Sequence, residues 1–290
     1  LSKTGEYNAA EDVDPYKDYP QLIVGKWFNF TPEASMYFEY NADNTFTKVG
    51  FDQALGWMNG QGTYVLNGDK LTDEYKNADG STFLNDINVV EITKDKFVFK
   101  GGQNPEIAFD DDKIHYRVKE QFDIKGNYTY LNAAARVVPA EGKTALQLPE
   151  GFLFNGENTI PVESLNGERI IDASKAFFAD ATFAEDGKLN HTMNGEVKVK
   201  NYTLNGNNLV FNLYEGSDVY KINATSFPDE DGDRLFIIMP KQAAWIGGFV
   251  SIIEEQNEGK KFSEAQIAEL EKEFMATFET FTVILSLSKK

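Results

Sequence analysis

The sequence predicts an all-β protein that contains two antiparallel β-barrels in tandem. Three observations lead to this prediction. Short runs rich in aromatic and β-branched residues alternate with turns along most of the chain. A single apolar stripe with helical spacing lies close to the C-terminus. Several short motifs of the first half also return, in the same order, in the second half.

Composition limits the classes of protein to which the chain can belong. Its 290 residues are long for one domain and sufficient for two, and 23 Phe and 13 Tyr can fill two cores. With 46 acidic against 28 basic residues, the net charge of −18 disfavours nucleic acids and anionic membrane surfaces as partners. The absence of cysteine excludes disulfides, thiolate nucleophiles and cysteine-ligated zinc. No apolar run of 18 residues predicts a membrane-spanning helix.

The first half begins with a polar segment and continues as a barrel. Residues 1–21 are acidic and poor in apolar side chains, so we expect a flexible tether. Residues 22–120 then form the first barrel. The dipeptide Asn67-Gly68 is typical of a type I′ hairpin turn between two of its strands. The expected strands are 25–30, 35–40, 45–51, 60–66, 70–72, 87–92, 96–100 and 113–118.

The second barrel is expected at residues 121–290 and includes one helix, at 263–279. Ser263 and Gln266 form a capping box, and an apolar stripe at helical spacing follows them. The segment 132–175 is expected to be irregular, and a final strand at 281–287 closes the chain. The other expected strands are 126–131, 176–183, 196–204, 208–214, 219–224, 234–239 and 244–253.

An internal repeat relates the two halves. TYVLNGDKL at 63–71 is echoed by NYTLNGNNL at 201–209, and the same offset of 138 residues relates 95–97 to 233–235. Two further pairs share a pattern at other offsets, the turns at 42–46 and 185–189 and the tripeptides at 25–27 and 126–128. Asn-Gly turns are common, so chance similarity is the alternative. The conserved order of the four pairs favours duplication.

The tripeptide Gly25-Lys26-Trp27, placed before a series of hairpin strands, resembles the G-x-W signature of lipocalins and calycins. The chain is similar to the lipocalin-like domains of cell-envelope lipoproteins of gut Bacteroidetes, most of which have unknown function. The second half departs from the signature because Tyr128 stands at the tryptophan position. We expect Trp27 and Tyr128 to be structural residues that close one end of each barrel.

The resemblance also implies a location. It implies an exported protein of the cell envelope, in the periplasm or on the outer-membrane surface. We expect the protein to be a monomer. A lipid anchor on a cysteine upstream of Leu1 would provide the membrane contact.

The sequence predicts no catalytic residue, no metal site and no cofactor. His115 and His191 are the two histidines, and neither has neighbours typical of a triad or a zinc site. Residues 229–233 place acids at positions 1, 3 and 5 of a calcium-type loop. Arg234 and Pro240, however, stand where such a loop needs glycine and glutamate, so we expect a solvated hairpin turn.

Aromatic residues beside glycines are the candidate ligand-binding positions: Trp57 in the first half, and Trp245 and Phe249 beside Gly247-Gly248 in the second. The alternative for each is an ordinary core position. We predict a non-catalytic binding protein that holds a small apolar or amphipathic ligand in a barrel, with the larger second barrel as the better candidate. The alternative is a surface lipoprotein that contacts a glycan or a protein partner through exposed loops, and a hydrolase is the third hypothesis.

Overall fold

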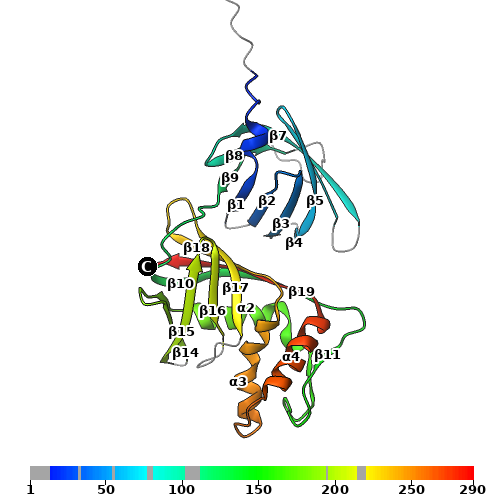
Figure 1. Ribbon diagram of the computed structural model, residues 1–290, viewed down its shortest axis with the longest axis vertical. Coiled ribbons are helices and arrows are strands. Elements are labelled where there is room, and N and C mark those ends of the chain that lie inside the picture. The colour runs from blue at the N-terminus through cyan, green and yellow to red at the C-terminus, as the bar shows by residue number, and fades with distance from the viewer. Residues whose placement is uncertain are drawn as a thin grey trace, which may run out of the picture. The chain divides into compact units, whose positions relative to one another are not determined.

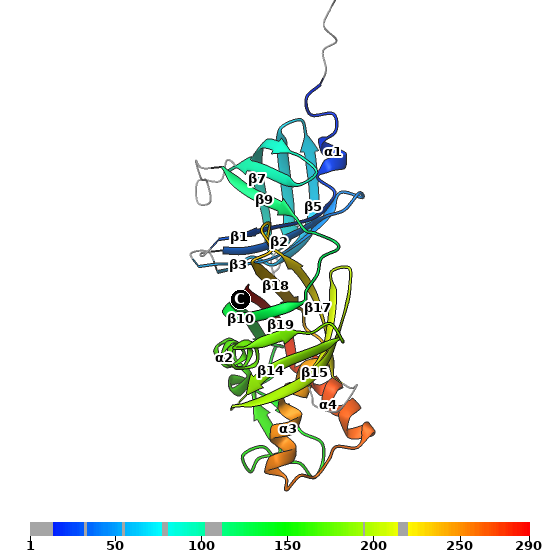
Figure 2. The same cartoon turned by 90° about the vertical axis from the view of Figure 1, so that its left-hand side faces the viewer.

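A computed structural model describes residues 14–31, 34–53, 56–76, 81–101, 112–193, 195–213 and 220–290. The chain forms two compact units, residues 1–117 and 118–290 (Figures 1 and 2). Of the predicted tether, residues 1–13 lie outside the described part of the chain. Residues 14–18 include a turn, and a short helix, α1 (Tyr19–Leu22), follows. No described helix is both long and apolar enough to span a membrane.

The first unit is a closed antiparallel barrel of eight strands, with a short ninth strand added to β3. Around the ring the order is β1-β2-β3-β5-β6-β7-β8-β9, and β9 pairs with β1. Side chains alternate between the interior and the outside, as a pleated strand requires. The strands are β1 (Gly25–Phe30), β2 (Ala34–Tyr40), β3 (Thr45–Asp52), β4 (Gly56–Trp57), β5 (Gly60–Asn67), β6 (Lys70–Lys76), β7 (Thr82–Ile92), β8 (Lys96–Lys100) and β9 (Lys113–Arg117).

The second unit is also a closed antiparallel barrel, in the order β10-β13-β14-β15-β16-β17-β18-β19. Its strands are β10 (Gly126–Pro139), β13 (Ala181–Phe183), β14 (Lys188–Met193), β15 (Glu196–Asn205), β16 (Asn208–Asn212), β17 (Lys221–Pro228), β18 (Arg234–Met239) and β19 (Phe278–Lys289). A small sheet of β11 (Ala145–Gln147) and β12 (Thr159–Pro161) lies outside the barrel ring. The predicted fold class, two closed antiparallel barrels with a helix before the last strand, is confirmed.

The helix content of the second unit is larger than the sequence predicted. Besides α4 (Glu264–Thr277), the described residues contain α2 (Gly167–Phe178) and α3 (Gly247–Gln256), with short 3₁₀ turns at η1 (Val162–Leu165) and η2 (Ala243–Ile246). The predicted strand at 244–253 is therefore wrong, and so is the first part of the strand predicted at 176–183. An apolar run of strand length cannot be told from a helix that is buried on one side.

Local signals explain why α2 and α4 begin where they do. The Asn166 side chain caps α2 by accepting a hydrogen bond from the Arg169 amide at 3.0 Å. The predicted capping box of Ser263 and Gln266 starts α4. On α4, Leu270 and Phe274 are fully buried, and the Phe274 ring centre lies 5.2 Å from that of Phe281 on β19.

The sequence repeat has a counterpart in the hydrogen bonding of the two barrels. In the first, the Tyr64 hydroxyl donates to the carbonyl of Asn41 at 2.8 Å. In the second, the Tyr202 hydroxyl donates to the carbonyl of Ala184, also at 2.8 Å. Each bond ties the strand before the Asn-Gly turn to the preceding hairpin turn. The echoed residues therefore occupy equivalent places in both units.

Candidate functional site: a cavity in the second barrel

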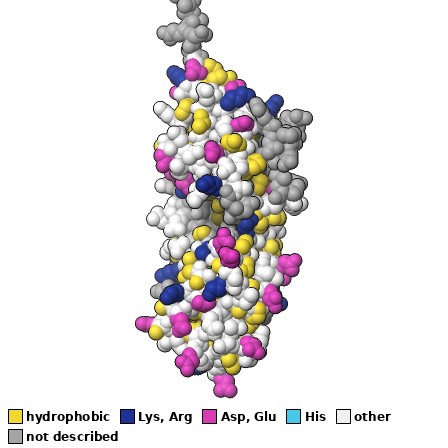
Figure 3. Space-filling view, turned by 90° about the vertical axis from the view of Figure 1, so that its right-hand side faces the viewer, with side chains coloured by type: hydrophobic (Ala, Val, Ile, Leu, Met, Phe, Trp, Pro, Cys, Tyr) yellow, Lys and Arg dark blue, Asp and Glu magenta, His cyan; other side chains and the backbone are white. Residues whose placement is uncertain are grey.

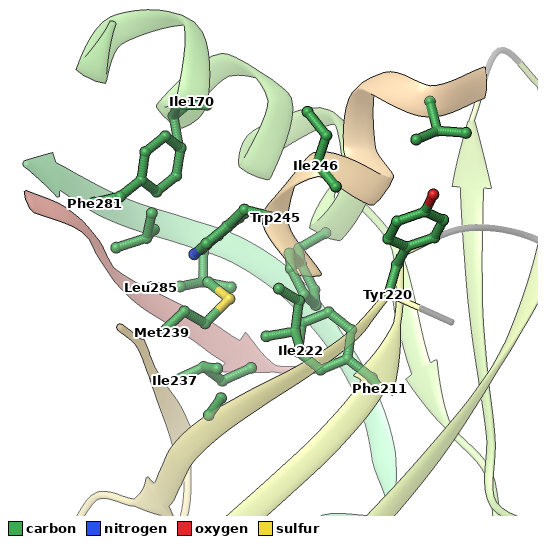
Figure 4. Close-up of a cluster of buried hydrophobic side chains, with 14 of the residues drawn as sticks. Ile170, Phe211, Tyr220, Ile222, Ile237, Met239, Trp245, Ile246, Phe281 and Leu285 are labelled. Carbon is green, nitrogen blue, oxygen red and sulfur yellow. The ribbon is translucent and has the colours of Figure 1, made fainter. Parts of the chain in front are cut away.

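A cavity of about 590 Å³ opens between α2, α3 and strands β14, β15, β16 and β18 of the second unit. Figure 4 shows part of the buried cluster around it, with Trp245 in the middle of the labelled side chains. Buried side chains form the floor, and exposed ones form the mouth. The lining residues are Ile170, Ala173, Ser174, Ala176, Phe177, Phe178, His191, Lys198, Lys200, Phe211, Leu213, Met239, Trp245, Gly247, Gly248, Phe249, Ser251 and Ile252.

The two helices that line the cavity present different groups to it. On α2, Ile170, Ser174 and Phe178 recur every four residues and are buried, so that one face of the helix forms a wall. The Ser174 hydroxyl donates to the Ile170 carbonyl at 2.8 Å, which leaves this wall largely apolar. On α3, the amino-terminal turn passes so close to Tyr220 that a Cβ added to Gly247 would lie 2.4 Å from the Tyr220 Cβ.

Trp245 and Phe249, two of the predicted ligand-binding residues, both line this cavity. The Trp245 indole is 8% exposed, donates to the Pro240 carbonyl at 3.0 Å, and lies 5.1 Å from the Phe281 ring centre. Phe249 is half-buried at the start of α3. Trp245 therefore belongs to the core as well as to the cavity wall, whereas Phe249 is the more accessible ring.

The third predicted residue, Trp57, belongs to the other unit. It lies on β4, is half-buried, and its ring centre is 5.5 Å from that of Phe51. The ring does not line the second-barrel cavity.

The two residues predicted to be structural are buried near the starts of the first strands of the two barrels. Trp27 on β1 is fully buried, its Nε1 donates to the Ile23 carbonyl at 2.7 Å, and the Arg117 guanidinium lies 4.0 Å from its ring centre. Tyr128 on β10 packs edge-on against Phe183 with ring centres 5.8 Å apart, and burial raises its pKa to about 12. Both rings thus lie at matching positions of the two barrels.

A basic strip inside the cavity was not predicted from the sequence. On β15, Lys198 and Lys200 both line the cavity, whereas the intervening Val199 and the preceding Val197 are 47% and 67% exposed on the outside. Lys200 is only 7% exposed. The alternation is thus reversed relative to the usual pattern, with cations inside and valines outside.

His191 of β14 completes the strip. It is paired with Lys198 across the two strands, and its ring stacks on Phe177 with centres 4.0 Å apart. Lys198 is also bonded at 3.0 Å to the carboxylate of Glu196, which is 74% exposed. None of the described lining residues is an aspartate or glutamate.

Equivalent positions of the first barrel carry glycine. Lys48 of β3 pairs with Gly60 as His191 pairs with Lys198, and Phe46 pairs with Gly62 as Leu189 pairs with Lys200. Those glycines allow close packing, because a Cβ on Gly62 would lie 1.9 Å from the Glu74 carbonyl oxygen. A Cβ on Gly60 would lie 2.7 Å from the Tyr75 ring.

The interior of the first barrel holds a buried polar cluster instead. Asp73 is 3% exposed and its Oδ2 accepts from the Tyr40 hydroxyl at 3.3 Å, whereas Oδ1 has no partner in the described structure. Burial raises the pKa of Asp73 to about 7, although the charge of Lys48 acts in the opposite direction. Lys48 donates to the Tyr75 hydroxyl at 3.5 Å, and burial lowers its pKa to about 8.

His115 lies beside this cluster among aromatic rings. Its ring centre is 4.6 Å from those of both Phe38 and Phe99. Burial, helped by the charge of Lys48, lowers its pKa to about 3. The imidazole is therefore neutral over the physiological range.

The acidic turn at 229–233 folds upon itself. Asp229 Oδ1 accepts from the amides of Gly232 and Arg234 at 2.8 and 3.1 Å, which is how an aspartate closes a hairpin turn. Within the described residues, no group of three or more His, Cys, Asp or Glu side chains is placed to hold a metal ion.

Comparisons with known proteins identify no family. No family model matches the chain, and no curated protein matches it. Among solved structures, the chain is similar to an NMR structure of a protein from Bacteroides uniformis ATCC 8492, at 15% identity and a TM-score of 0.26. That match covers 34% of this chain and 90% of the other. At this TM-score the similarity supports no inference about function.

Proposed function

We propose that the protein is a non-catalytic binding protein of lipocalin-like type, which holds a small amphipathic molecule in the cavity of its second barrel. The observation that supports this proposal is the cavity of about 590 Å³, whose walls are mostly apolar and whose polar groups are few. Sites that bury most of a drug-sized ligand have volumes of roughly 300–1,000 Å³ and this kind of lining.

The arrangement of the lining also favours a ligand that enters from the helical side. The exposed residues Ala173, Gly248 and Ile252 surround the mouth, while Phe211 and Met239 lie buried at the floor. A molecule with an apolar body can thus pass between α2 and α3 and bury that body against the floor. Each buried CH₂ group would contribute about 0.8 kcal/mol.

A neutral fluorescent probe tests this proposal without involving charge. N-phenyl-1-naphthylamine is expected to bind the folded protein saturably with increased emission. Replacing Ser174, which lines the wall of α2, by Phe is expected to block the cavity and to abolish the signal. The control Lys175→Leu changes an exposed residue of the same helix that does not line the cavity, and it should retain binding.

Two results would count against the proposal. One is an absence of saturable probe binding to protein that is folded, as shown by its cooperative urea denaturation. The other is equal binding by Ser174→Phe and Lys175→Leu, which would place the probe elsewhere. In either case the surface-interaction hypothesis would replace it, with glycan-array binding as its test.

Location in the cell envelope and lipid anchoring are part of the same proposal and rest on the resemblance described above. Metabolic labelling of native cells with an alkyne-tagged palmitate would test them. Absence of label from the full-length native protein would contradict the anchor while leaving ligand binding unaffected.

A further inference from the structure

The charge inside the second barrel differs from that of the chain as a whole. Acidic residues outnumber basic ones by 46 to 28. On the face shown in Figure 3, acidic, basic and apolar side chains are interspersed. Among the described residues that line the cavity, by contrast, the charged ones are Lys198 and Lys200, and there is no carboxylate.

The fold directs both lysines into the cavity. They are two residues apart on β15, so the pleat places them on the same face, and that face also carries the buried Tyr202. The Tyr202 hydroxyl is fixed by its bond to the Ala184 carbonyl, which pins the register of the strand. A slip by one residue would turn both lysines outward and the valines inward.

A cation placed this way acts more strongly on an anion than a surface lysine does. Lys200 is 7% exposed and lines the cavity together with apolar groups such as Phe211 and Phe178, and water screens a charge poorly at such a buried position. Lys198 is closer to solvent, at 33% side-chain exposure, and is bonded to the exposed Glu196. Because Lys200 is the more deeply buried of the two lysines, it is the stronger anchor for an anion.

We propose that the ligand is an anionic amphiphile, with one carboxylate or sulfate head group and an apolar body. This inference rests on the proposed function and specifies the ligand class of that same site. The head group binds Lys200, with Lys198 and the His191 ring beside it on the same wall. The body lies between Phe177, Phe249 and the helix walls.

Displacement of N-phenyl-1-naphthylamine from the full-length protein tests the head-group preference. The competitors are dodecanoate, 1-dodecanol and dodecyltrimethylammonium, which share the alkyl chain and differ in charge. Dodecanoate is expected to displace the probe at about 10-fold lower concentration than dodecanol, because a hydrogen bond to a charged group is worth roughly that factor. The cationic competitor is expected to be the weakest.

Two variants test whether the preference for dodecanoate depends on the lysines of the cavity wall. Lys200→Met keeps the length of the side chain and removes its charge, so the preference for dodecanoate over dodecanol should fall to less than about twofold. The control Lys188→Met changes an outward-facing lysine on β14 that donates to Asn201 at 2.6 Å. This variant should keep the wild-type preference for dodecanoate over dodecanol.

The outcomes separate this inference from the proposed function. If the probe binds but dodecanoate and dodecanol compete equally in the wild-type protein, the ligand class is wrong and the binding function stands. If Lys200→Met binds the neutral probe and keeps the full preference, the anion site is not at this strip, and the inference is overturned. If no probe binds, both proposals fail.

Discussion

Two of the buried titratable groups of the first barrel, Asp73 and His115, should have opposite effects on its stability as the pH changes. Asp73 has a folded-state pKa of about 7, above the ordinary value near 3.9. The folded state therefore holds this proton more tightly. Its stabilising contribution is complete below about pH 4 and is lost as the pH rises towards 7.

His115 behaves in the opposite way. Its folded-state pKa of about 3 lies below the ordinary value near 6.5, so the unfolded chain binds the proton more tightly. The contribution of the neutral imidazole is present above about pH 6.5 and is lost as the pH falls towards 3. Between about pH 4.5 and 6 each group changes the free energy of unfolding by about 1.4 kcal/mol per pH unit, with opposite signs, and the two nearly cancel.

Single substitutions should reveal how each group by itself changes the free energy of unfolding with pH. Relative to the wild-type protein, His115→Phe should lose about 2 kcal/mol of unfolding free energy as the pH rises from about 4.5 to 6, because the Asp73 slope is no longer opposed. Asp73→Asn should gain a similar amount over the same interval. Taking each difference from the wild-type curve removes the contribution of all other groups.

Urea denaturation at several pH values measures these differences. A Trp245→Phe background leaves Trp27 and Trp57, both in the first unit, as the fluorescent reporters of its unfolding. Differences that do not depend on pH, or that have the opposite signs, would refute the reasoning. They would mean that Asp73 is ionised or His115 protonated in the folded barrel.

Two further predictions concern the second unit. Leu270→Asp should destabilise it by about 3 kcal/mol or more in urea denaturation, because Leu270 is fully buried on the inner face of α4. The control Ala268→Asp, on the exposed face of the same helix, should cost no more than about 1 kcal/mol. Equal costs would mean that the helix is not docked. Gly247→Ala should lower the melting temperature, at a cost of about 1–3 kcal/mol, because its Cβ would collide with Tyr220. Gly248→Ala meets open space and should stabilise α3 by up to about 1 kcal/mol. A lower melting temperature for Gly248→Ala than for Gly247→Ala would contradict the close approach of α3 to Tyr220.

The architecture could be predicted from the sequence because turns and alternation are local signals. Asn67-Gly68 ends β5 where the hairpin dipeptide indicated, and the Ser263 capping box starts α4. What failed was the distinction between strand and helix in short apolar runs. The segment that became α3 has no side-chain cap, so its boundaries gave no helical signal. For α2 a signal existed in the Asn166 cap and the spacing of Ile170 and Phe178.

The candidate site was predicted only in part. Trp245 and Phe249 were singled out because glycines flank them, but the helices that complete the cavity wall were not foreseen. The basic strip could have been found from the repeat. Tyr202 corresponds to the inward-facing Tyr64, and a period of two then places Lys200 and Lys198 on the same interior face. The missing step was to assume that equivalent residues of the two halves face the same side of their barrel.

The same register produces two different interiors, and two positions on one strand account for much of the difference. In the first barrel, Gly60 and Gly62 let the backbone and ring of Tyr75 approach β5 closely. In the second, Lys198 and Lys200 occupy the equivalent positions, and side chains of that length prevent such an approach. The cavity of the second barrel is bounded by these lysines on one wall and by α2 and α3 at its mouth. A barrel whose strand alternates glycine inside can be filled by its own aromatic rings. One that alternates lysine inside has charged side chains along one wall of a cavity.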